Sequence, residues 1–134
     1  MISGIKSIKN VGKYEQFDST EQFDKNTMIF GFNGAGKSTL SDIFYSLTSR
    51  ENQCSLSLRR TLNRPGEDGT KQMEIVLGNE NGEDIIFTGE EWNKFPENLY
   101  VFNKYYIEDH VFVSKHLQGC LLYTSDAADD RISV

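Results

Sequence analysis

The chain has 134 residues and a formal net charge of −6; charged residues make up 25% and hydrophobic residues 37%. This length suits one domain with a modest core. No apolar run reaches the roughly 18 residues that suggest a membrane span, and residues 1–6 lack the apolar block of a signal peptide. We therefore expect a cytoplasmic protein with no membrane partner. The acidic balance argues against a broad nucleic-acid-binding surface.

The N-terminal quarter predicts strands and a loop. Apolar residues recur every third position in residues 2–14, which fits neither a regular helix nor a regular strand. The β-branched content and glycines favour a strand with a bulge. Residues 15–25 are polar and are predicted to form a loop. Residues 27–30 are a short apolar run ending at a glycine, which is typical of a strand buried on both faces of a parallel sheet.

A helix and a hairpin are predicted further along the chain. Leu40, Ile43, Phe44 and Leu47 follow the spacing of one helix face. Residues 63–70 have the composition of a loop. Alternating apolar residues around 73–77 and 85–87, joined by a turn-rich stretch, predict an antiparallel hairpin. Residues 99–102 predict another short strand, and residues 103–117 a loop followed by a short helix. The elements together favour an α/β fold.

Residues 31–38, Gly-Phe-Asn-Gly-Ala-Gly-Lys-Ser, fit the phosphate-binding pattern G-x-x-x-x-G-K-[ST] at every fixed position. In such a loop, successive backbone N–H groups turn inward and form a nest for phosphate oxygens. Glycines permit the backbone angles and the close approach, and the following helix directs its positive end at the anion. The predicted nucleotide-binding residues are Gly31, Asn33, Gly34, Ala35, Gly36, Lys37, Ser38 and Thr39.

The expected ligands of this loop are ATP and Mg²⁺. Lys37 would reach the β- and γ-phosphates, and the Ser38 hydroxyl would bind Mg²⁺. Thr39 would add a contact nearer the α-phosphate. Asn103 follows a predicted strand end, where ligand-lining residues often lie, so it is a second candidate contact for Mg²⁺ or water.

The base-binding and catalytic residues are less defined by the sequence. Tyr14 or Phe17 could stack on adenine, although packing on the sheet is the simpler interpretation. The sequence assigns no catalytic residue.

The string GFNGAGKSTL at residues 31–40 resembles the Walker A motif of ABC, SMC and RecF-like ATPases. Residues 5–12 and 101–103 look like the N-terminal AAA-type ATPase domain of RloC and PrrC anticodon nucleases. The resemblance implies a P-loop NTPase fold, namely the N-terminal half of an ABC/SMC-like head with an antiparallel β subdomain. It also implies that two heads dimerise around ATP and couple its hydrolysis to an effector such as an RNA-targeting defence nuclease. Nucleic acid would be contacted only through other regions of such a protein.

The last residues differ in composition from the rest. Residues 120–129 closely resemble the translation of a transposase adapter used in sequencing libraries. We therefore expect residues 1–119 to be a truncated N-terminal lobe of a P-loop ATPase domain and residues 120–134 to be a non-native tail.

Two other functions remain open from the sequence. A P-loop kinase would need an arginine-rich lid, and a GTPase a base-reading N-K-x-D segment; residues 103–106 begin correctly but lack the aspartate. A nucleotide-binding fragment without turnover is the other alternative, because no signature motif, Walker B acidic pair or switch histidine can be identified.

Overall fold

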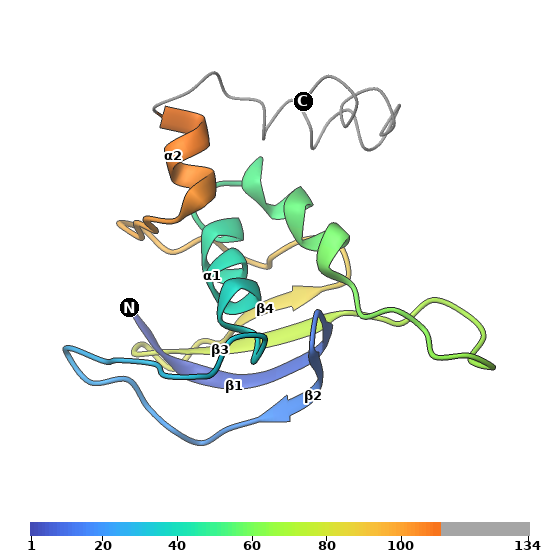
Figure 1. The fold of residues 1–134 in the computed structure, drawn as a ribbon. Coiled ribbons are helices and arrows are strands. Elements are labelled where there is room, and N and C mark those ends of the chain that lie inside the picture. The colour runs from blue at the N-terminus through green and yellow to red at the C-terminus, as the bar shows by residue number, and fades with distance from the viewer. Residues whose placement is uncertain (111–134) are drawn as a thin grey trace. The chain divides into compact units, whose positions relative to one another are not determined.

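The computed structural model describes residues 1–110. These residues belong to two compact units, Met1–Leu99 and a second unit that begins at Tyr100. The first unit contains four strands and two helical segments (Figure 1). Their bounds are β1 Ile2–Val11, β2 Tyr14–Asp18, α1 Lys37–Ser46, the 3-10 helix η1 Asn52–Arg59, β3 Glu74–Asn79 and β4 Ile85–Thr88.

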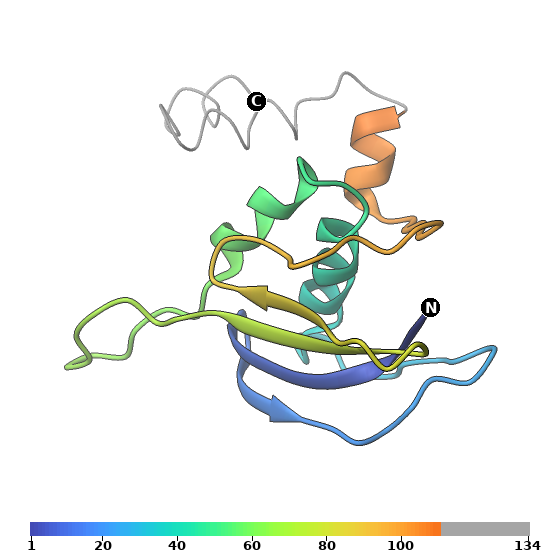
Figure 2. The same cartoon turned by 180° about the vertical axis from the view of Figure 1, so that it is seen from behind.

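The four strands form one antiparallel sheet in the order β2-β1-β3-β4. Helix α1 lies over one face of this sheet, and η1 lies on the same side (Figures 1 and 2). The presence of one sheet together with helices is consistent with the predicted α/β fold class. No helix among the described residues is long and apolar enough to cross a membrane.

Strand β1 has irregular pairing, which explains its unusual apolar spacing. Opposite β3, Ile5 pairs with Leu77 and Ser7 pairs with Val76, so β1 contains one extra residue between these pairs. Such a bulge moves the following side chains to the other face of the strand. Ile5 and Ile8 are therefore both buried although they are three positions apart. The predicted bulged strand is confirmed.

The predicted hairpin is confirmed as β3 and β4. Ile75 stands opposite Phe87 and Leu77 opposite Ile85, and all four side chains are buried. Successive side chains of a strand point to opposite faces, so these residues share one face. They form a core with residues of β1, α1 and the connecting segments: Ile5, Ile8, Val11, Leu40, Ile43, Leu47, Leu56, Met73 and Trp92.

The predicted helix after the glycine-rich loop is also confirmed. Leu40, Ile43 and Leu47 are buried and Phe44 is partly buried against the same core. Trp92 packs on Phe87 with ring centroids 5.2 Å apart. The Trp92 ring N–H donates to the Ser46 hydroxyl at 2.9 Å. This bond ties the end of α1 to the segment after β4.

Three predictions of secondary structure are wrong. Residues 27–30 and 99–102 form no strand, and neither segment pairs with a strand among the described residues. Most of residues 27–30 is exposed instead of buried on both faces. Conversely, residues 14–18, mostly within the predicted loop, pair with β1 as strand β2.

The described part of the second unit contains helix α2, Lys104–His110. The short helix predicted within residues 103–117 is confirmed over this range. Asn103 accepts a hydrogen bond through Oδ1 from the Tyr106 N–H at 3.1 Å. This contact satisfies a free N–H in the first turn, as an N-cap residue does. Residues 111–117 and the predicted tail, 120–134, lie outside the described residues.

Candidate functional site

The glycine-rich segment 31–36 is a loop that leads directly into α1, which begins at Lys37. Gly34 and Gly36 have φ angles of 83° and 107°, in the left-handed region that side chains disfavour. Gly31 has no such angle but lacks space: a Cβ there would lie 3.3 Å from the Ala35 Cβ. Glycine is therefore favoured at Gly34 and Gly36 by the backbone angle, and at Gly31 by the close approach of Ala35.

The side chains expected to bind phosphate and metal gather at the start of α1. Lys37 Nζ donates to the Gly31 carbonyl at 2.5 Å, so its ammonium lies across the loop. Ser38 is exposed in the first turn of the helix. The N-cap, Gly36, has no side chain to cap the helix, and no acidic residue lies in the first turn. The N–H groups at this end are thus suited to an anion.

Asn33 and Ala35 are exposed in the same loop, while Thr39 is buried. The Thr39 side chain packs on Gly12, where an added Cβ would lie 2.8 Å from Thr39 Oγ1. Asn103 belongs to the second unit and caps α2. The structure thus gathers residues 31–39, and it gives Asn103 a local structural role.

Tyr14, at the start of β2, packs directly on the loop. Its hydroxyl donates to the Gly36 carbonyl at 3.2 Å, and a Cβ at Gly36 would lie 2.9 Å from its ring. Burial raises the pKa of the Tyr14 phenol, which keeps the donating proton in place. The Phe17 ring meets the Tyr14 ring edge-on at 5.6 Å. Sequence reasoning considered Tyr14 for adenine stacking and missed this contact with the loop.

The turn between β1 and β2 is held by the segment that follows η1. Gly12 N–H donates to the Arg59 carbonyl, and the Thr61 hydroxyl donates to the Gly12 carbonyl at 2.7 Å. Arg59 also forms an ion pair with the buried Asp42 of α1. These contacts connect the turn, η1 and α1 into one support for the loop. No sequence signal indicated them, because the partners are far apart along the chain.

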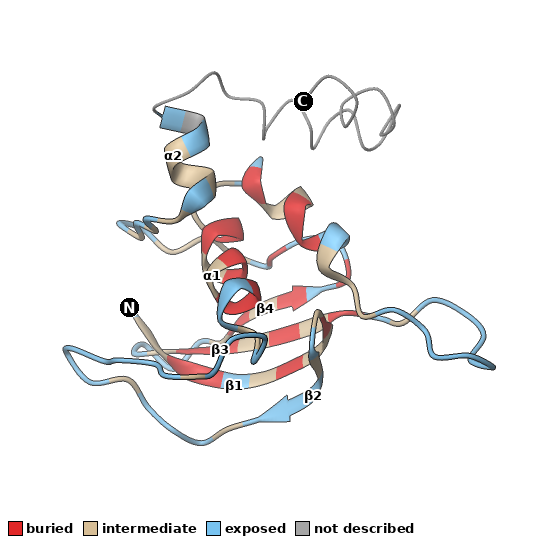
Figure 3. Ribbon diagram, in the orientation of Figure 1, coloured by how far each residue is buried: buried red, intermediate tan, exposed pale blue. Residues whose placement is uncertain are grey.

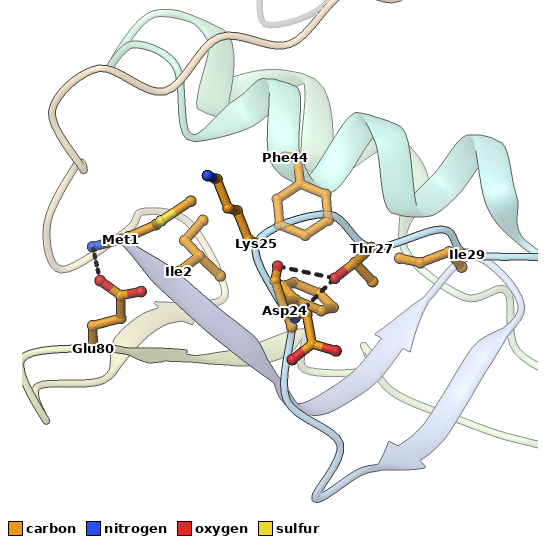
Figure 4. Close-up of a pocket in the computed structure, with 9 residues that line it drawn as sticks. Met1, Ile2, Asp24, Lys25, Thr27, Ile29, Phe44 and Glu80 are labelled. Carbon is orange, nitrogen blue, oxygen red and sulfur yellow. Dashed lines mark hydrogen bonds and ion pairs between the residues drawn. The ribbon is translucent and has the colours of Figure 1, made fainter.

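A separate cleft of about 460 Å³ lies beside the segment that precedes the loop (Figure 4). Thr27 accepts a hydrogen bond from the Asp24 N–H at 2.9 Å and so shapes one wall. The terminal amine of Met1 pairs with Glu80 at 4.0 Å on the opposite side. The lining includes none of residues 31–38: Met1, Ile2, Phe23, Asp24, Lys25, Thr27, Ile29, Phe44 and Glu80.

Comparison with known proteins gives one family. The sequence model of a family described as "AAA domain" matches residues 10–134, which include the whole loop and α1. No curated protein and no solved structure matches the chain. The match supports a P-loop ATPase type of domain and a nucleotide-binding function, as the sequence predicted at this level. From the extent of the match, the chain belongs to the AAA domain family.

Proposed function

We propose that the chain binds ATP with Mg²⁺ at residues 31–39. The observation that carries this proposal is the geometry of the loop and the helix start together. Gly34 and Gly36 turn the backbone through left-handed angles immediately before α1. Lys37 crosses the same loop to the Gly31 carbonyl. A backbone nest, a helix N-terminus and a cation therefore converge on one exposed place, as phosphate binding requires.

The residues fit the ligand in distinct roles. The N–H groups of the loop and the first turn of α1 would hold phosphate oxygens, with Asn33 and Ala35 contributing through the loop. Lys37 would exchange its bond to Gly31 for the β- and γ-phosphates. The exposed Ser38 hydroxyl would bind Mg²⁺, which would neutralise phosphate charge. Thr39 remains the proposed contact nearest the α-phosphate.

Two finer contacts belong to the same proposal. Tyr14 and Phe17 form an aromatic pair beside the loop, and this position supports a role for either ring at the adenine. Asn103 is proposed as a contact for Mg²⁺ or water, although its side chain caps α2 in the structure. For that contact, Asn103 would have to keep or exchange the Tyr106 bond.

We place the chain in the N-terminal half of an ABC/SMC-like head, in the manner of RloC- and PrrC-like proteins. The loop sequence at residues 31–40 supports this narrower assignment. Two heads would meet around ATP, and hydrolysis would open them and so switch an attached effector. Any contact with nucleic acid would be made by that effector. A cytoplasmic location is consistent with this role.

The direct test is Lys37→Ala. Removing the ammonium should weaken ATP–Mg²⁺ binding by about 1.5–3 kcal/mol, the worth of a charge-assisted hydrogen bond, or roughly tenfold to a hundredfold in Kd. Isothermal titration calorimetry measures the change. Lys25→Ala is the matched control, because Lys25 is also exposed but lies outside the loop. Equal affinity of Lys37→Ala and the parent would remove the phosphate-binding assignment.

The proposed division at residue 119 has its own test. Residues 120–134 have no periodic apolar face in their sequence, so we propose that they do not contribute to the domain. Deleting them should change neither the melting temperature nor the affinity for ATP–Mg²⁺. A clear drop in either quantity would show that the tail packs on residues 1–119 and would contradict the proposed division.

A further inference from the structure

Three successive residues at the turn between β1 and β2 each lie beside a residue of the glycine-rich loop or of the start of α1. Gly12 packs on Thr39, and Tyr14 packs on Gly36. Between them, Lys13 extends beside Gly34, where a Cβ would lie 3.2 Å from the Lys13 Nζ. The turn thus brings a second lysine to the loop, from a segment outside the phosphate-binding motif.

The Lys13 side chain is exposed to solvent. Among residues 1–110, no carboxylate forms an ion pair with it. The nearest acidic residue along β2, Glu15, is bound by both of its oxygens to Arg64 at 2.7 Å. The positive charge of Lys13 is therefore not neutralised within this part of the chain.

The backbone of Lys13 is fixed relative to the loop, although its side chain is long and exposed. The preceding residue, Gly12, is held by Arg59 and Thr61, and the following residue, Tyr14, is held by Gly36. Reaching a ligand in the loop then needs only a change of side-chain rotamer. The entropy cost of such a contact is limited to one side chain.

The two lysines approach the loop from different elements. Lys37 belongs to α1 and contacts the loop at Gly31, whereas Lys13 belongs to the turn and lies at Gly34. An anion held by the N–H groups of this loop would therefore meet an ammonium from each element. Lysine binds phosphate as a compact point charge and needs no fixed fork geometry.

We propose that Lys13 is a second phosphate-binding cation of this site, selective for nucleotides with two or more phosphates. The inference rests on the proposed function, because it assigns a further contact to the same ligand. A single phosphate can be satisfied by the backbone nest and Lys37. A longer, more highly charged phosphate chain gains from a second ammonium at the other side of the loop.

The test compares the full chain with Lys13→Gln, Lys13→Arg and the control Lys25→Gln. Calorimetry with ATP–Mg²⁺, ADP–Mg²⁺ and AMP gives the affinities. Lys13→Gln should weaken ATP and ADP binding by about fivefold to twentyfold, the lower range of a charge-assisted contact at an exposed site. The loss for AMP should be smaller. Lys13→Arg should retain most of the affinity, and Lys25→Gln all of it. Melting temperatures should be equal, because Lys13 is exposed.

The outcomes separate this inference from the function on which it rests. If the parent binds ATP and Lys13→Gln binds it equally well, Lys13 is not a phosphate ligand, while the loop assignment stands. An equal loss in Lys25→Gln would reveal a general charge effect and would also overturn the inference. If the parent binds no nucleotide, both the proposed function and this inference fall.

Discussion

Two segments of this chain are both rich in apolar residues, but the structure buries these side chains in one segment and exposes them in the other. Residues 73–88 form a hairpin whose inward side chains are buried, Phe87 being 1% exposed. Residues 27–32 contain an even higher share of apolar residues, yet Phe30 is 83% exposed and Phe32 80%. Figure 3 shows this contrast between the buried strands and the exposed segment that leads into α1.

The difference lies in where each segment finds its partner. Strand β4 pairs with β3 across a short turn, and β3 pairs with β1, so neighbouring elements satisfy the backbone and bury the side chains. Residues 27–30 have no such partner among the described residues. The rings of Phe30 and Phe32 pack edge-to-face with their centroids 5.8 Å apart, and both residues remain largely exposed. Apolar composition indicates a tendency towards burial, but it does not identify the partner.

The difference in burial can be tested most directly by replacing one phenylalanine of each segment with alanine. Phe87→Ala should lower the free energy of unfolding by about 3–5 kcal/mol, because it opens a cavity in the core. Phe30→Ala should change it by less than about 0.5 kcal/mol, as is usual at exposed positions. Urea unfolding of the two variants measures both values. A comparable loss for Phe30→Ala would mean that residues 27–32 are packed in solution.

A second pair of variants compares the stability cost of adding a Cβ in two glycine-containing loops. Gly36 and Gly66 both have left-handed φ angles, 107° and 90°. A Cβ at Gly36 meets the Tyr14 ring at 2.9 Å, while one at Gly66 meets nothing within 4 Å. Gly36→Ala should therefore cost about 2–3 kcal/mol and Gly66→Ala only about 1 kcal/mol, the backbone term alone.

Thermal unfolding and ATP titration of these two variants check the expectation together. Only Gly36→Ala should also weaken nucleotide binding, because Gly36 ends the loop. Similar stabilities for the two variants would indicate that the Tyr14 ring moves away at little cost.

The smallest expected effect concerns the bond between the turn and the loop. Tyr14→Phe removes the hydroxyl that donates to the Gly36 carbonyl and should cost about 0.5–1.5 kcal/mol. Burial raises the pKa of Tyr14 in the folded state, so the folded chain holds this proton more tightly than the unfolded chain. The contribution should be complete below the ordinary tyrosine pKa of about 10. It should be lost as pH rises through the higher folded-state value.

Denaturant unfolding of the parent and Tyr14→Phe between pH 7 and alkaline pH measures this dependence. The difference between the two proteins should shrink at high pH. A difference that stays constant across the range would show that the phenol does not titrate with folding.

The sequence by itself determined the elements whose signals are local. The phosphate-binding motif fixes glycine at positions 31 and 36, and position 34 within it is also a glycine. In the structure Gly34 and Gly36 have left-handed backbone angles, and a Cβ at Gly31 would lie close to Ala35. The helix from Lys37 and the β3–β4 hairpin followed from periodicity, since a repeat of side chains along one element fixes which face is apolar. The bulge in β1 was indicated by apolar spacing that fitted neither period.

Tertiary structure decided which segments meet. Strand β2 forms by pairing with β1, whereas residues 27–30 pair with no strand among the described residues and stay exposed. The placement of Lys13 and Tyr14 on the loop depends on contacts between Gly12, Arg59 and Thr61, far apart along the chain. Such contacts form only when distant elements fold together, so no local pattern encodes them. The second cation beside the loop therefore emerged from the fold, while the first was evident in the motif.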